Sequence, residues 1–193
     1  MRTVFFDIDT QLDFVYPAGA LYAPHADRIV PVVAGLNRFA AQHGFPVVST
    51  VDAHLEDDIE FQTWPRHCVA GTIGQRKAES TLLERRVVVP NEAGEAALEG
   101  SQQIILEKQT VDAFATVSLQ RVLNHLAADN YVIYGVVTEI CVLHAARGLL
   151  KTGKSVTLVT DAVEALTAGG SAMALNELSG LGATLATYRQ IVG

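Results

Sequence analysis

Short apolar runs that alternate with longer amphipathic stretches restrict the fold of this chain more than any other feature of its sequence. Each run is four to six residues long, and most are rich in β-branched or aromatic side chains. Continuous apolar runs of this length are typical of strands that are buried on both faces, as in a parallel sheet. We therefore predict strands at 3–8, 46–51, 86–89, 103–106, 131–136, 155–159 and 183–186.

The stretches between the runs have the spacing of amphipathic helices. In the stretch 26–43, Ile29, Val33 and Leu36 recur on one stripe, and the turn-forming Gly44 follows it. The same pattern predicts further helices at 115–128, 139–152 and 167–181. Strands that alternate with helices connect through right-handed crossovers. The predicted fold class for residues 1–193 is a single α/β domain, with a doubly wound, mostly parallel sheet between two layers of helices.

Composition restricts the partners and the compartment. The 193 residues carry a net charge of −7, which offers no basic surface to a phosphate backbone, so nucleic acid is not an expected partner. No window approaches the roughly eighteen uncharged apolar residues of a membrane span, and the N-terminal segment is predicted to be a strand rather than a signal peptide. Cys68 and Cys141 are too few for a disulfide scaffold. We expect a cytoplasmic protein whose thiols are reduced.

Chemically active side chains follow four of the predicted strands. The first strand is followed by Asp9, the second by Asp52 and His54, the run at 103–106 by Lys108, and the run at 131–136 by Cys141. Ligands of open α/β sheets bind at the carboxyl ends of the strands, so these side chains are expected to meet at one edge. The segment 52–82 is longer than most loops, and long loops in compact domains often carry function.

Cys141 is the candidate nucleophile. It lies about one turn into its predicted helix, where free amide groups would lower the pKa of the thiol. The amides of Thr138 and Cys141 can also hold a developing oxyanion. Asp9 can accept the thiol proton if burial keeps it close to neutral, and Lys108 would steady the ionised states. Each residue also has an ordinary explanation: a small buried hydrophobe for the cysteine, a turn cap for the aspartate and a solvated side chain for the lysine.

The long loop contains a candidate metal site. Asp52 and His54 are followed by an acidic run that ends in Glu60, and then by His67. Two histidines with two carboxylates form a mixed nitrogen and oxygen ligand set that suits zinc, iron or manganese. A solvated polar loop with a few histidines would contain the same residue types.

Several segments resemble the nicotinamidase branch of the isochorismatase-like cysteine hydrolases. Residues 9–14, Asp-Thr-Gln-Leu-Asp-Phe, resemble the D-x-Q-x-D-F opening of that family, and residues 136–142 resemble its nucleophile segment. Residues 52–54 and 67–71 resemble its metal-site segments, D-x-H and H-C-V-x-G. Lys108 matches the lysine of its catalytic triad. The matches extend over most of the chain, from about residue 4 to about residue 159.

The resemblance implies a metal-dependent amidohydrolase that converts nicotinamide to nicotinate and ammonia through a thioester. The implied catalytic residues are Asp9, Lys108 and Cys141. The implied oxyanion hole consists of backbone groups of Val137, Thr138 and Cys141, and the substrate ring is expected between Phe14 and Trp64.

The resemblance also implies one bound divalent ion, with zinc as the first expectation and iron or manganese as alternatives. The implied ligands are Asp52, His54, Glu60 and His67. The family often has a third histidine ligand, but this loop has no histidine between His54 and His67. Glu60 is assigned to that place, with Asp57 and Asp58 as alternatives.

Two other functions fit the same fold. A related hydrolase could act on a ureido or carbamoyl compound or on isochorismate, and such an enzyme would not need the metal ligands. A non-catalytic α/β binding protein could keep the fold, but it would be expected to lack one of the triad residues. On either enzymatic reading the partner is a small molecule, and the helical surfaces together with family habit predict a homo-oligomer.

Overall fold

The computed structural model describes residues 2–94 and 96–193. In this part of the chain, seven strands form one sheet in the order β3-β4-β2-β1-β5-β6-β7. Every neighbouring pair is parallel. The strands are β1 (Thr3–Ile8), β2 (Val47–Asp52), β3 (Arg86–Val89), β4 (Gln103–Lys108), β5 (Asn130–Val136), β6 (Ser155–Glu164) and β7 (Thr184–Ala186).

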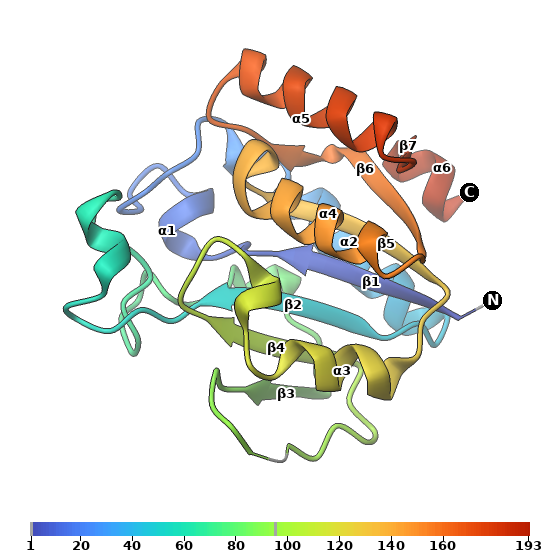
Figure 1. The fold of residues 1–193 in the computed structure, drawn as a ribbon, viewed down its shortest axis with the longest axis horizontal. Helices are drawn as coiled ribbons and strands as arrows, with labels where there is room; N and C mark the ends of the chain where they lie inside the picture. The colour runs from blue at the N-terminus through green and yellow to red at the C-terminus, as the bar shows by residue number, and fades with distance from the viewer. Residues whose placement is uncertain (1, 95) are drawn as a thin grey trace.

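Helices cover both faces of the sheet (Figure 1), which confirms the predicted three-layer α/β fold. They are α1 (Leu12–Val15), α2 (Val30–Gln42), α3 (Leu119–Leu126), α4 (Leu143–Lys151), α5 (Ala168–Gly180) and α6 (Tyr188–Val192). In the view of Figure 1, α3 and α4 lie in front of the sheet and α2 lies behind it. Helix α5 packs beside α4, and α6 packs beside α2. Among the described residues, no helix is both long enough and apolar enough to cross a membrane.

Two of the predicted helices begin later than their apolar spacing indicates. Residues 26–28 form a separate 3-10 turn, and α2 starts at Val30 with Pro31 in its first turn, where the missing amide of proline is not needed. The helix predicted at 115–128 is α3 alone, because Thr116 is extended and separates it from a 3-10 turn at 113–115. The spacing does not predict α1 or α6, since each has fewer than two turns.

Strands β2 and β4 end later than predicted, and both end on a candidate functional residue. Strand β2 continues to Asp52, and β4 continues to Lys108, with which Asp52 is paired in register. Both residues are therefore held by the sheet itself rather than by a loop. Strand β6 also continues, to Glu164, after a shift in its register with β5. The strand pairing thus fixes an acid and a lysine side by side at the carboxyl edge of the sheet.

The predicted loop 52–82 extends from this same edge (Figure 1) and contains little regular structure beyond the short 3-10 turns η2 (Ile59–Gln62) and η3 (Glu79–Thr81). Backbone hydrogen bonds join it to the segment after β1: Leu12 donates to the carbonyl of Arg76, and Asp13 donates to that of Gly74. The loop is consequently held against the carboxyl ends of β1 and β2.

Gly135 of β5 is paired with Ile8 of β1, where the backbones leave no room for a side chain. It has φ of +120°, and a Cβ atom built there would lie 2.1 Å from the carbonyl oxygen of Ile8. We expect Gly135→Ala to lower the free energy of unfolding by more than about 1 kcal/mol, because both the backbone angle and the contact exclude a side chain. The control is Gly169→Ala in α5, where the added Cβ meets nothing within 4 Å. Equal denaturant midpoints for the two variants would contradict this prediction.

Candidate active site and metal centre

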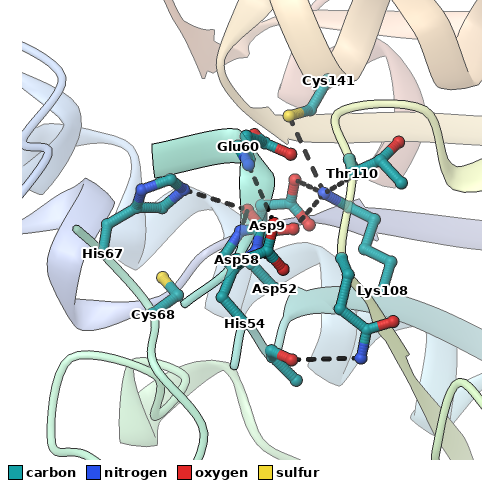
Figure 2. A network of polar contacts seen from close by, with 12 residues as sticks. Asp9, Asp52, His54, Asp58, Glu60, His67, Cys68, Lys108, Thr110 and Cys141 are labelled. Atoms are coloured by element: carbon teal, nitrogen blue, oxygen red, sulfur yellow. Dashed lines mark hydrogen bonds and ion pairs between the residues drawn. The ribbon is translucent and has the colours of Figure 1, made fainter. Parts of the chain in front are cut away.

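The three candidate catalytic side chains meet at the carboxyl edge of the sheet (Figure 2). Lys108 Nζ lies 2.9 Å from Asp9 Oδ2 and 3.9 Å from Cys141 Sγ. It also donates to the carbonyl of Thr110 and pairs with Asp52. Four separate segments of the chain therefore converge on one ammonium group, as the positions after the strands predict.

Asp9 is held in place by its backbone and by β2. It has a left-handed φ of +49°, its amide donates to the carbonyl of Thr50, and the hydroxyl of Thr50 donates to Asp9 Oδ1 at 2.6 Å. Burial raises the pKa of Asp9, and the nearby charge of Lys108 opposes that rise. A carboxylate with a raised pKa is suited to accepting and returning a proton, in agreement with the expectation from the sequence.

Lys108 separates two carboxylates with different pKa shifts. Burial would lower the pKa of Lys108, but the charges of Asp52 and Asp9 raise it well above its usual range. Although Asp52 is also buried, the charge of Lys108 and the neighbouring imidazoles of His54 and His67 hold its pKa well below the usual value. Lys108 and Asp52 thus keep their charges, which leaves Asp9 as the group that can exchange a proton.

The thiol of Cys141 differs from the sequence prediction. It lies in the π-helical turn η5 (Thr138–Val142), as the pattern predicted, but its pKa is raised rather than lowered. Burial is the largest cause, and the charge of Lys108 opposes it. The dipole of a short turn does not outweigh the cost of placing a thiolate in a buried site. A thiol with a raised pKa needs a proton acceptor before it can act as a nucleophile.

Three residues form a candidate metal centre beside this group. Asp52, His54 and His67 are all buried, and their ligand atoms lie within 4.8 Å of one another. Nε2 of His54 and Nε2 of His67 each lie 3.8 Å from Asp52 Oδ2. A single ion can bridge such separations with nitrogen and oxygen ligands at about 2.0–2.2 Å.

The other ring nitrogen of each histidine is occupied by a neighbour. Nδ1 of His54 lies 3.0 Å from Asp58 Oδ2, and Nδ1 of His67 lies 2.7 Å from the carbonyl of Pro65. Both histidines therefore aim Nε2 at the centre, the arrangement in which outer hydrogen bonds orient metal-binding imidazoles. His54 Nε2 is also buried without a hydrogen-bond partner in the part of the chain that the structure describes. An unsatisfied buried nitrogen fits a metal ion at this point.

The acidic residues of the loop occupy three different positions. Asp57 is exposed, and Asp58 is turned towards the far side of His54. Glu60 lines a pocket together with Asp52, but it does not belong to the candidate metal centre formed by Asp52, His54 and His67. Its pKa is raised by burial and by the charge of Asp52. The predicted role of Glu60 as a ligand therefore stays a prediction, whereas Asp57 and Asp58 are not placed to bind the ion.

Several of the remaining predicted site residues line one narrow pocket. Its lining includes Phe14, Trp64, Val137 and Cys141. Thr138 is buried at the start of η5. Because the first amides of a helical turn have no partners within it, the backbone around Thr138 is suited to an oxyanion.

Residues 3–190 match the family model described as the isochorismatase domain. The chain belongs to the isochorismatase family. The nicotinamidase of Escherichia coli (strain K12) is 25% identical over 201 residues, which cover 93% of this chain and 92% of that protein.

Two crystal structures of similar proteins cover nearly the whole chain. The pyrazinamidase/nicotinamidase from Streptococcus mutans UA159 is 28% identical with a TM-score of 0.81, over 95% of this chain and 99% of that one. The pyrazinamidase of Pyrococcus horikoshii, determined in complex with zinc, is 29% identical with a TM-score of 0.80, over 97% of this chain and 99% of that one. These relatives confirm the resemblance of this isochorismatase-family chain to the nicotinamidase branch.

Some of the side chains that support the site escape sequence reasoning. Thr50 contacts Asp9 only because β1 and β2 pair in register, so no local pattern reveals it. Asp58 was considered as a ligand, whereas it supports His54 from behind. The signal for this contact was the four-residue spacing of the two side chains.

Removing the outer partner of His54 is expected to weaken metal binding without abolishing it. We expect Asp58→Ala to lower zinc affinity about 10–100-fold, because His54 loses the contact that orients its ring. His54→Ala removes a ligand and should reduce the affinity further. Asp57→Ala is the control, since this exposed neighbour touches neither histidine. Competition with a chromophoric chelator measures all four proteins, and equal affinities for Asp58→Ala and Asp57→Ala would contradict the assignment.

The charge of Asp9 contributes to the raised pKa of Cys141. Asp9→Asn removes that charge, so the thiol should ionise, and react with iodoacetamide, at lower pH than in the wild type. The measurement is the alkylation rate of Cys141 against pH in chelator-treated protein, with the modified peptide identified by mass. Asp57→Asn serves as the control and should leave the profile in place. A profile that moves to higher pH in Asp9→Asn would show that this electrostatic account is wrong.

Proposed function

We propose that this isochorismatase-family hydrolase converts nicotinamide to nicotinate and ammonia. One observation carries the proposal: Asp9 and Cys141 contact Lys108 beside the candidate metal centre, and Cys141 lines a pocket together with Asp52 and His67 of that centre. Relatives that are named as nicotinamidases or pyrazinamidases support the choice of substrate.

Asp52, His54 and His67 would hold the divalent ion, with zinc favoured over iron or manganese. When bound, the ion supplies a Lewis acid that can coordinate the ring nitrogen of a pyridine. The apolar walls of the pocket suit the rest of such a ring, because Phe14 and Trp64 offer aromatic surface to a flat heterocycle.

The first half of the reaction follows from the pKa shifts. Asp9 accepts the proton of the Cys141 thiol, and the resulting thiolate attacks the carboxamide carbon. The backbone around Val137, Thr138 and Cys141 stabilises the negative charge on the carboxamide oxygen. Asp9 then gives its proton to the departing nitrogen, which leaves as ammonia, and a thioester to Cys141 remains.

In the second half, water hydrolyses the thioester. Asp9 takes a proton from the attacking water, and nicotinate is released as the sulfur of Cys141 departs and recovers the proton. Lys108 stays protonated throughout because of its two carboxylate neighbours, so its role is electrostatic.

Three wider expectations remain predictions on this proposal. The reaction would serve NAD salvage, the protein would be cytoplasmic, and the chain would assemble as a homo-oligomer.

The direct test is ammonia release from nicotinamide by purified, zinc-loaded protein. Wild-type protein should release ammonia, and Cys141→Ala should lower kcat by at least about 10³-fold, because the nucleophile has no substitute. Metal analysis of the same samples should give about one ion per chain for both proteins, as a closed ligand set predicts.

No ammonia release from metal-loaded wild-type protein would reject nicotinamide as the substrate. A panel of other small amides, including carbamoyl and ureido compounds, then separates a different hydrolase from a non-catalytic protein. Cys141→Ala remains the control for each substrate in the panel.

A further inference from the structure

A second buried lysine–carboxylate pair lies beneath the catalytic residues and takes no part in the chemistry described above. Lys77 Nζ lies 2.8 Å from Asp7 Oδ2, and the side chains of the pair are 2% and 0% exposed. Burying an ion pair carries a large desolvation penalty unless further hydrogen bonds satisfy both partners. This pair therefore calls for an explanation beyond general stability.

Both members of the pair hold Thr10, the residue after the catalytic acid. Lys77 Nζ donates to Thr10 Oγ1 at 2.5 Å, and the same hydroxyl donates to Asp7 Oδ1 at 2.9 Å. The hydroxyl thus accepts from the ammonium and donates to the carboxylate. Because Asp9 has a left-handed φ and precedes Thr10 directly, fixing Thr10 also fixes the backbone that carries the catalytic carboxylate.

The backbone around Lys77 reinforces this contact. Gln11 and Lys77 form an antiparallel bridge, and the amide of Ala78 donates to the carbonyl of Thr10. The side-chain amide of Gln11 donates to the carbonyls of Asp52 and Gln75. The segments 9–13 and 74–78 consequently form one unit, with Lys77 as the charged link that enters the interior.

Asp7 extends the link into the sheet and α2. Its Oδ2 accepts from Asn37 Nδ2 at 2.9 Å and lies 3.3 Å from the hydroxyl of Ser49, and Tyr134 donates to Asn37 in turn. These partners belong to α2, β2 and β5. The carboxylate that holds Lys77 is thereby fixed to three elements of the rigid core.

We propose that Lys77 is a positioning residue, which acts through Asp7 and Thr10 to hold the catalytic carboxylate of Asp9 in its reactive place. The proposal deepens the function proposed above and rests on it for the role of Asp9. Lys77 touches no substrate and no candidate metal ligand, so its effect should appear in the chemical step rather than in substrate or metal binding.

The first experiment compares Lys77→Met with Lys151→Met, an equal substitution at an exposed lysine at the end of α4. Lys77→Met should lower kcat for nicotinamide about tenfold or more, because small displacements of a catalytic group can cost on the order of 10²-fold in rate. The KM and the zinc content should stay within twofold of the wild type. Lys151→Met should match the wild type in all three.

The double variant Asp7→Asn with Lys77→Met separates positioning from mere stability. It leaves no buried charge unpaired, so it should recover most of the thermal midpoint that Lys77→Met loses, whereas kcat should stay low because the contact to Thr10 is still missing. Recovery of both quantities would overturn the proposal. If Lys77→Met alone does not fold, the double variant is compared directly with the wild type by the same criteria.

Hydrogen exchange tests the inference without any substrate. In the double variant, the amides of residues 9–13 and 74–78 should exchange at least tenfold faster than in the wild type, while those of α5 should not change. Unchanged exchange at 9–13 would overturn the proposal. A wild-type protein that is inactive on nicotinamide would reject the proposed function, and the exchange result would still decide the role of Lys77 in holding this turn.

Discussion

The ammonium group of Lys108 lies between two buried carboxylates, and the properties of the site depend on this contact. One positive charge cannot fully compensate two negative charges in a buried site, so the pKa values of the two carboxylates shift in opposite directions. Asp52 also faces two histidines and its pKa is lowered, whereas the pKa of Asp9 is raised. Lys108 thus helps to keep Asp52 of the candidate metal centre ionised. Its other partner, Asp9, remains able to accept a proton.

Sheet topology brings these groups together. Strands β4, β2, β1 and β5 are neighbours, although their order along the chain is different. Because all four are parallel, their carboxyl ends deliver Lys108, Asp52, Asp9 and the turn of Cys141 to one edge. Register gives the finer placement, since Asp52 is paired directly with Lys108. The candidate ligands His54 and His67 lie in the loop 52–82, which is hydrogen-bonded to the segment after β1.

The sequence was sufficient for features that depend on local pattern and insufficient for those that depend on register and burial. Apolar runs located every strand, because strands buried on both faces contain few polar residues. The ends of β2 and β4 were missed because Asp52 and Lys108 are charged, and only their contact with each other allows them to be buried. The pKa of Cys141 was predicted in the wrong direction because helix position is visible in a sequence and desolvation is not.

Hydrogen bonding explains why the proposed proton transfer is assigned to Asp9 and not to Asp7, an equally buried carboxylate two residues earlier. The carboxylate of Asp7 receives contacts from Thr10, Asn37, Ser49 and Lys77, so both of its oxygens already have donors. Oδ2 of Asp9 faces Lys108 but has no well-aligned hydrogen-bond donor among the described residues. A fully satisfied carboxylate stabilises structure, whereas an incompletely satisfied one retains the capacity to move a proton.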